Sequence, residues 1–317
     1  MAGPITVTIA GITGKFAGLL SKHLLTKPNI SINGIARNPD KVPKELANHS
    51  QVRIFQANAD DETALRAALK GSQVAVCCYL GDVKLMEEGQ KTLIDACIAE
   101  EVPRYVAGDW SLDFRGLKLG DHSQKDPMKL VQSYLEEKEK ETNGAIKGVH
   151  ILNGIFMEIF FSFAHVMDIS NIEAPVFNAW GTLDEPWEAT TYEDAARYTA
   201  LAAADESAVG FLNVLGDRKT TRQIAKEFSE VYDIEAKAES SGTLDELRSK
   251  MSEEYKAEPD NPRRWMSYFY CYYMMNGSTL LRSVDNESYP EFGKCTTFKD
   301  MMERTGSPKA LSKVAFM

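Results

Sequence analysis

Gly11, Gly14 and Gly18 lie between a β-branched run, Ile5–Ala10, and a segment with apolar residues at helical spacing, Lys15–Leu25. The pyrophosphate of a dinucleotide requires such a turn, because the backbone must approach the phosphates closely and the N–H groups at the helix start must point at them. Glycine also serves as simple turn punctuation, but here a strand precedes it and a helix follows. The spacing is G-x-x-G-x-x-A-G rather than G-x-G-x-x-G. The cofactor contacts expected here are Gly11, Thr13, Gly14, Lys15 and Phe16.

Two basic residues, Arg37 and Lys41, follow the second expected strand, where an NAD-type site offers an acid to the ribose 2′-hydroxyl. They are one helical turn apart, so the planar fork of Arg and the point charge of Lys can face one phosphate. A merely solvated basic cluster is a weaker interpretation, because helix N-termini disfavour cations. The cofactor predicted is therefore NADP(H). Asp60, after the third strand, lies where such sites usually flank the adenine. Acidic capping of the next helix at Asp61 explains this acidic pair equally well.

The fifth expected strand ends in Gly108-Asp109-Trp110, at the carboxyl edge of the sheet where ligands bind. Asp109 could act as a general base or anchor a cationic amine, and Trp110 could stack on a flat aromatic substrate or on the cofactor. A helix cap plus a core aromatic explains the same two residues equally well. His122 lies in the irregular stretch 108–126, which is longer than an ordinary connection and so is expected to be functional. A lone histidine, however, is more often structural.

Other strand ends supply further expected contacts. Backbone atoms after the fourth strand should pass beneath the cofactor ribose, and residues after the sixth should wall the nicotinamide. A run of Tyr, Phe, Trp and Met at 265–275 is either a helix packed in a core or the lining of an adaptable apolar pocket. The additional cofactor contacts expected are Tyr79, Leu80, Gly108, Asn153 and Ile155, and the substrate contacts expected are Trp110, His122, Phe156, Tyr268 and Tyr272.

The elements that must position these residues alternate regularly in the first half of the chain. Strands are expected at 5–10, 30–36, 52–57, 73–79, 104–107 and 149–152, with helices at 15–25, 61–70, 83–101 and 128–141. This alternation predicts an α/β fold with a doubly wound, parallel Rossmann sheet. After residue 152 short strands and helices follow. We expect an NADP(H)-binding domain over 1–152 and a smaller α+β substrate-binding cap over 153–317, some segments of which return to the core sheet.

Composition excludes several classes of protein. The 317 residues carry a formal charge of −10, which argues against a surface that follows nucleic-acid phosphates or docks on an anionic membrane. No unbroken apolar run could span a bilayer, and the N-terminus lacks the features of a signal peptide, so a cytoplasmic location is expected. The five cysteines have no C-x-x-C spacing, which predicts buried free thiols and no metal site.

The segments GITGKFAG, ARNPDK, VRIFQANADD and ILNGIFMEIF resemble the NmrA-like and isoflavone-reductase-like group of atypical short-chain dehydrogenases. The similarity extends over roughly residues 4–215, and GDWSLDF and DPMK look similar to fungal members associated with secondary metabolism. It implies an NADPH-binding Rossmann domain, a small C-terminal substrate domain, and a lysine beside the nicotinamide on the helix after the fifth strand. Lys129 best matches that lysine, although an insertion follows around 141–147. A buried lysine there could move a proton, whereas an exposed helix lysine would not.

The same helix contains a Y-x-x-x-K pair, Tyr134 and Lys138. In ordinary short-chain dehydrogenases such a tyrosine is the acid and the lysine lowers its pKa, and the i,i+4 spacing does put both on one face. The charged residues around the pair, however, indicate a solvated surface, and the group that the sequence resembles does not use it. We therefore interpret the pair as a chance occurrence.

The resemblance leaves the reaction open, because members of the group include reductases of benzylic ethers and enones, a non-catalytic redox sensor, and an NADPH-bound fungal enzyme that performs a semipinacol rearrangement. The leading expectation is an NADPH-dependent reductase of a hydrophobic aromatic or alkaloid-like metabolite, acting as a monomer or homodimer. One alternative is a non-redox isomerase of fungal alkaloid biosynthesis that keeps NADPH as a scaffold. Another is an NADP(H)-sensing regulatory protein.

Overall fold

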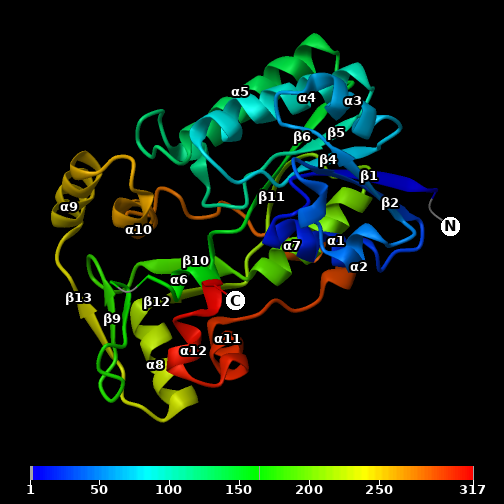
Figure 1. Cartoon of the computed structure of the whole chain (residues 1–317). Coiled ribbons are helices and arrows are strands. Elements are labelled where there is room, and N and C mark those ends of the chain that lie inside the picture. The colour runs from blue at the N-terminus through cyan, green and yellow to red at the C-terminus, as the bar shows by residue number, and fades with distance from the viewer. Residues whose placement is uncertain (1–2, 164, 317) are drawn as a thin grey trace.

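A computed structural model of the chain describes residues 3–163 and 165–316. Its centre is a seven-stranded sheet with the order β11-β6-β5-β4-β1-β2-β3, in which every pair of neighbours is parallel (Figure 1). The strands are β1 (Ile5–Ala10), β2 (Ile30–Ala36), β3 (Val52–Gln56), β4 (Val74–Cys77), β5 (Arg104–Val106), β6 (Lys147–Leu152) and β11 (Gly210–Asn213). The order reverses beside β1, so the turn after β1 lies at the switch point where such sheets bind ligands.

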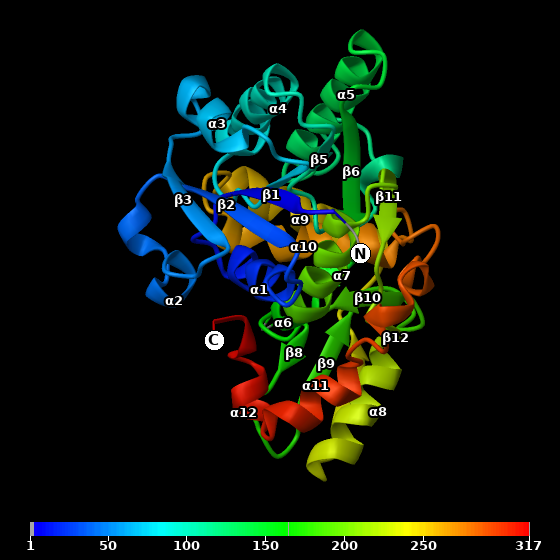
Figure 2. The same ribbon diagram turned by 90° about the vertical axis from the view of Figure 1, so that its right-hand side faces the viewer.

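Helices cover both faces of this sheet (Figure 2). One face carries α1 (Lys15–Leu24), which packs against α7 (Tyr192–Ala204), and the other carries α3 (Glu62–Leu69), α4 (Gln90–Ala99) and α5 (Asp126–Glu141). Because both faces are covered, β4 is buried along its whole length, as its continuous apolar sequence predicts. The doubly wound parallel sheet predicted from the sequence is confirmed.

One expected element needed correction. The helix expected over 83–101 is split into a π-helical segment, Leu85–Gly89, and the α-helix α4. As expected, a segment of the second half returns to the core sheet: β11 is its seventh strand and pairs in parallel with β6.

The second half of the chain builds a smaller α+β part with two three-stranded sheets, of order β12-β10-β7 and β13-β9-β8. Aromatic side chains fill its core, among them Phe160, Trp187, Phe228 and Phe298. Its strands are β7 (Ile155–Phe156), β8 (Met167–Asp168), β9 (Val176–Ala179), β10 (Pro186–Thr190), β12 (Asp217–Thr220) and β13 (Lys237–Ser240). Its helices are α6 (Met157–Phe160), α8 (Thr221–Tyr232), α9 (Leu244–Ala257), α10 (Pro262–Met275), α11 (Phe298–Thr305) and α12 (Pro308–Leu311). The exact boundary at 152/153 stays a prediction.

The five thiols are free, as expected; four of them are buried, whereas Cys78 is half-buried. Within residues 3–163 and 165–316, no cluster of three or more metal-ligating side chains is found. In the same part of the chain, no helix combines the length and the apolar character that crossing a membrane requires.

Candidate nucleotide and substrate site

The glycine turn after β1 has the geometry that a bound pyrophosphate requires. Gly11 has φ +82°, and a Cβ there would lie 2.7 Å from the carbonyl oxygen of Cys78, so only glycine fits. Gly14 is the N-cap of α1, where no side chain caps the helix and no acid lies in the first turn. The amide donors at this positive helix end are therefore left for an anionic ligand. The turn fits the phosphates of a dinucleotide.

The residues expected to read the adenosine half lie on exposed turns. Arg37 and Lys41 flank a short 3₁₀ turn, Pro39–Lys41, that Asn38 caps by accepting from the amide of Asp40 at 3.0 Å. Both cations are exposed and make no ion pair within the described chain. After β3, Asp61 caps α3 by accepting from the amide of Ala64. Asp60 is exposed and does not cap this helix.

A row of aromatic rings starts at the glycine turn. The Phe16 ring lies 4.2 Å from that of Trp110 and 6.1 Å from that of Phe156. Phe156 stacks on Tyr192 at 3.9 Å between ring centres, and the Lys15 Nζ lies 5.2 Å from the centre of the Tyr192 ring. Four segments distant in sequence thus build one apolar wall beside the turn. The sequence analysis missed Tyr192, whose only signal is its place at the start of a helix directly after β10.

Trp110 and Asp109 point to opposite sides of the sheet edge. Trp110 adopts φ +32°, and its indole Nε1 donates to the Thr199 hydroxyl on α7 at 2.9 Å. Asp109 is buried, and its Oδ2 lies 2.6 Å from Nδ1 of His150 on β6. The His150 ring in turn stacks on the ring of Phe211. Asp109 Oδ1 has no hydrogen-bond partner. The pairing of Asp109 with His150 was not foreseen, because a histidine inside an apolar strand gives no sign of its partner.

Asn153 follows β6 and is fully buried, yet neither its side-chain oxygen nor its nitrogen has a hydrogen-bond partner. Buried amides are normally partnered, so this side chain would gain from a ligand that carries both a donor and an acceptor. Gly154 is fixed beside it at φ +69°, where a Cβ would lie 2.3 Å from the Glu188 carbonyl oxygen. Ile155 is buried in β7, directly before Phe156.

Lys129 lies on the first turn of α5, half-buried, and its Nζ donates to the Phe114 carbonyl oxygen at 3.3 Å. One turn earlier is Lys125, whose side chain is only 2% exposed and whose Nζ donates to the Tyr270 hydroxyl at 2.9 Å. The sequence analysis missed both Lys125 and Tyr270. The signals available were the i,i+4 spacing of the two lysines and the aromatic run in α10.

The remaining expected contacts are placed as follows. The Tyr79 ring lies along the glycine turn, 3.4 Å from where a Gly11 Cβ would be, whereas the Leu80 side chain is almost fully exposed. Gly108 donates its amide to Gln90 Oε1 at 3.0 Å. Tyr268 stacks on His165 and Tyr272 meets Tyr273 edge-on, so both contribute at least in part to the packing of α10.

His122 is fully enclosed by rings of α10, with centroids 5.1 Å away at Phe269, 5.5 Å at Tyr270 and 5.7 Å at Tyr273. Neither ring nitrogen has a hydrogen-bond partner. Burial, and to a lesser extent the charge of Lys125, holds the pKa of His122 well below its ordinary value. The imidazole is therefore neutral at physiological pH.

The Tyr134 and Lys138 pair is engaged elsewhere on α5. Tyr134 donates to Asp95 of α4 at 2.6 Å, and Lys138 pairs with Glu141 at 2.7 Å. Burial and the neighbouring Asp95 carboxylate raise the pKa of Tyr134 above its ordinary value, which makes it a poorer acid. These contacts favour the interpretation of the pair as a chance occurrence.

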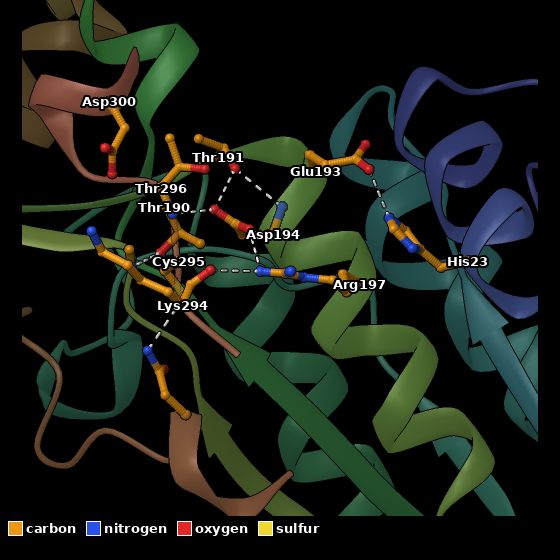
Figure 3. A network of polar contacts seen from close by, with 12 residues as sticks. His23, Thr190, Thr191, Glu193, Asp194, Arg197, Lys294, Cys295, Thr296 and Asp300 are labelled. Atoms are coloured by element: carbon orange, nitrogen blue, oxygen red, sulfur yellow. Dashed lines mark hydrogen bonds and ion pairs between the residues drawn. The ribbon is translucent and has the colours of Figure 1, made fainter. Parts of the chain in front are cut away.

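A polar network holds α7, and with it Tyr192 and Thr199, in place (Figure 3). Asp194 accepts from the Thr296 amide at 2.8 Å and from Arg197 at 2.7 Å, and Arg197 also donates to the Lys294 carbonyl oxygen. On the other side of the helix, Glu193 meets His23 of α1 at 2.9 Å. The Glu193–His23 contact thus joins the second half of the chain to the last turn of α1 in the first half.

Comparisons with known proteins agree with this geometry. Residues 11–144 match the model of the NAD(P)H-binding family. A curated relative, the oxidoreductase claK of Passalora fulva, is 29% identical over 76 residues, which span 23% of this chain and only 28% of that protein. An isoflavone reductase structure superimposes with a TM-score of 0.76 at 12% identity, covering 95% of this chain and 99% of the other. AtPrR2, solved with NADP⁺ and (+)-pinoresinol, gives a TM-score of 0.75 at 14% identity, covering 96% and 99%.

The family match and the two superpositions concern the same features that the sequence motifs indicated. The matched residues begin at Gly11 and include both basic residues after β2 and Lys129. The fold similarity extends over the second half of the chain as well. The expected fold of the isoflavone-reductase-like group is confirmed, as is the expected nicotinamide dinucleotide cofactor: the chain contains an NAD(P)H-binding domain over residues 11–144 and has the fold of isoflavone reductase.

Proposed function

We propose that this protein is an NADPH-dependent reductase of a hydrophobic aromatic or alkaloid-like small molecule. The observation that carries the proposal is the row of aromatic rings that begins at the uncapped N-terminus of α1. The helix N-terminus would bind the pyrophosphate, and a flat apolar substrate would pack on the rings. The half-buried Lys129, on the helix that follows β5, supports the proposal because it could move a proton.

NADPH fits the residues that are present. The glycine turn receives the pyrophosphate, Arg37 and Lys41 hold the 2′-phosphate, and the unpartnered amide of Asn153 is available to the nicotinamide carboxamide. When bound, the cofactor supplies a hydride to an electrophilic carbon of the substrate. Phe16, Phe156 and Tyr192 exclude water from that side of the site because their rings pack together.

Lys129 is the proposed proton donor. Its Nζ has one hydrogen bond, to the Phe114 carbonyl oxygen, so its other hydrogens are available to a substrate atom that gains negative charge. Asp109 has a supporting role in this proposal, because its carboxylate is buried against His150 and has a single free oxygen. We therefore assign Asp109 the role of orienting neighbouring groups such as His150, and not that of a general base.

The test is to incubate the protein with NADPH and a panel of aromatic enones, benzylic ethers and alkaloid imines, and to follow both nicotinamide absorbance and product. Loss of the absorbance in step with product formation supports the reductase. Product that forms while NADPH stays intact shows a rearrangement enzyme instead. No conversion of any panel member, together with a partner protein that is captured with NADPH but released with NADP⁺, shows a redox sensor.

A further inference from the structure

A cavity of about 450 Å³ lies at the edge of the central sheet opposite the glycine turn. Its lining comes from the amino ends of four neighbouring strands, β4, β5, β6 and β11, and from the turns that lead into β6 and β11. The glycine turn, in contrast, follows the carboxyl end of β1, which is parallel to these strands. The cavity therefore has no part in the reaction proposed above. The lining residues are Gln73, Pro103, Arg104, Gly144, Lys147, Glu206, Ser207 and Val209.

Two cations of this lining, Arg104 and Lys147, lie side by side. They are register partners on β5 and β6, so their side chains leave the same face of the sheet from strands about 4.8 Å apart. Neither side chain forms an ion pair within residues 3–163 and 165–316. Two like charges at this separation repel each other. An anion bound between the two side chains would replace this repulsion by attraction.

The guanidinium group of Arg104 is buried but still has unused donors. Arg104 is 4% exposed, and its Nη1 donates to the carbonyl oxygens of Ala202 and Asp205, at 3.0 and 2.7 Å. Its Nη2 donates to the Ala203 carbonyl oxygen at 2.9 Å. These bonds use three of the five N–H groups and are all to neutral acceptors. In the part of the chain that the structure describes, the N–H at Nε and one at Nη2 make no hydrogen bond. N–H groups of a guanidinium match the oxygens of a carboxylate.

The nearby acids compensate for these cations only in part. The carboxylate of Asp205 is occupied: Oδ1 accepts from the amide and hydroxyl of Ser207, at 2.9 and 2.7 Å, and Oδ2 accepts from the Tyr289 hydroxyl at 3.0 Å. Among the lining residues that the structure describes, Glu206 is the one acid, and its side chain is exposed. The lining therefore carries two positive charges and one negative charge, which favours an anionic ligand.

The cavity also has an apolar side, formed by Pro103 and Val209. Both residues are exposed, and Val209 is 39% exposed although it directly precedes a strand of the central sheet. Removing such apolar surface from water is favourable. A ligand with a short apolar chain would cover these two residues while its charged end meets the cations.

We propose that this cavity is a binding site for a small organic carboxylate. The carboxylate group lies between the side chains of Arg104 and Lys147, and the apolar chain of the ligand packs on Pro103 and Val209. The site is separate from the glycine turn and from the aromatic wall. The inference therefore does not depend on the reaction that the protein catalyses.

Binding of hexanoate tests the site, with the neutral amide hexanamide as the matched ligand without the charge. Each is titrated into the NADP⁺-saturated protein and followed by ligand-observed NMR, so that the cofactor already occupies the anion-binding turn after β1. We expect hexanoate to bind at least about tenfold more tightly than hexanamide. Inorganic phosphate, which has no apolar chain, should bind more weakly than hexanoate.

Two substitutions of exposed lining residues should act in opposite directions. Lys147→Met should weaken hexanoate binding about two- to fivefold, because it removes one partly solvated charge. Glu206→Gln should strengthen it about twofold or more, because it removes the one acid of the lining. Lys140→Met is the control: Lys140 is also exposed and lies near the end of α5, outside the lining, and its replacement should leave both ligands unaffected. Arg104 is left intact because it also holds the end of α7.

Thermal unfolding of each variant verifies that changes in binding do not come from lost folding. Equal binding of hexanoate and hexanamide by the wild type would overturn the inference. It would also be overturned if Lys147→Met and Lys140→Met had the same effect, or if Glu206→Gln weakened the binding of hexanoate. Binding of phosphate as tight as that of hexanoate would show a general anion site and refute the assignment to organic carboxylates.

Discussion

Arg37 offers the sharpest test of which nicotinamide cofactor the protein prefers. It is exposed, forms no ion pair within the described residues, and follows the strand whose end lies beside the glycine turn. Its backbone carbonyl, not its side chain, accepts a hydrogen bond from Gln56. Replacing the side chain by alanine therefore removes nothing that the free protein uses, and we expect the free energy of unfolding of Arg37→Ala to change by less than about 0.5 kcal/mol.

The expected loss appears only when the 2′-phosphate is present. A hydrogen bond to a charged group contributes about 1.5 to 3 kcal/mol, which corresponds to about 10- to 150-fold in the dissociation constant of NADPH. NADH lacks that phosphate, so its dissociation constant should change by less than about twofold. Calorimetric titration of both nucleotides into the wild type and the variant measures the two ratios directly.

Lys44→Ala is the matched control, because Lys44 is also an exposed cation between β2 and β3, at the start of the short helix α2 (Lys44–Ala47) that follows the 3₁₀ turn. It should weaken NADPH binding by no more than about twofold through its general charge. If Arg37→Ala weakened NADPH and NADH equally, the arginine would not read the phosphate. If neither nucleotide were affected, the assignment of the basic turn as the 2′-phosphate site would be wrong.

Three further predictions follow from the geometry. Lys129→Met should lower kcat by about 10² or more while the NADPH dissociation constant stays within a few fold, whereas Tyr134→Phe should retain turnover, and steady-state kinetics that show the reverse would favour the Tyr134–Lys138 pair. Gly154→Ala should destabilise the fold by about 1 to 3 kcal/mol more than Gly120→Ala in urea unfolding, because both glycines have positive φ but only at Gly154 would a Cβ meet a backbone oxygen, at 2.3 Å. Burial lowers the pKa of His165 to about 4 in the folded protein. Between about pH 6.5 and pH 4 this histidine is therefore protonated in the unfolded protein but neutral in the folded one, so the free energy of unfolding should fall as the pH drops through this range. His165→Gln should show a shallower fall, and an unchanged slope would exclude this histidine as its source.

Local patterns predicted most of the nucleotide-binding half correctly. The strands at 5–10 and 30–36 have the bounds that their β-branched runs and the glycine turn indicate. Periodicity predicts these elements because each one buries an apolar face against its neighbours, and the apolar residues of that face recur in the sequence at the spacing of a helix or a strand. That β11 would pair with β6 could not be predicted, because the two parallel strands are joined by a long crossover, and a strand's own residues do not indicate its partner.

The candidate site was predicted less completely, for a related reason. Residues next to a strand end, such as Gly108 and Asn153, could be named because parallel strands bring their carboxyl ends to one edge, whereas Lys129 was named from the resemblance. Tyr192, His150 and Tyr270 could not, since each reaches the site through a packing contact with a distant segment. Lys125 was missed because a lysine in sequence reads as exposed, and only the structure shows that α10 covers it.

These contacts also explain why the nucleotide half alone would not form the site. The Phe16 ring packs near Phe156 at the end of β7, and Trp110 donates to Thr199 on α7; both elements belong to the second half of the chain. The guanidinium group of Arg104 on β5 donates to three carbonyl oxygens at the end of α7, at 2.7 to 3.0 Å, so that helix is fixed at both ends. A buried arginine that satisfies helix-terminal carbonyls is costly to release. The glycine turn and the aromatic wall are therefore coupled through α7. If they bind cofactor and substrate as proposed, a substitution that loosens α7 should weaken the binding of both ligands.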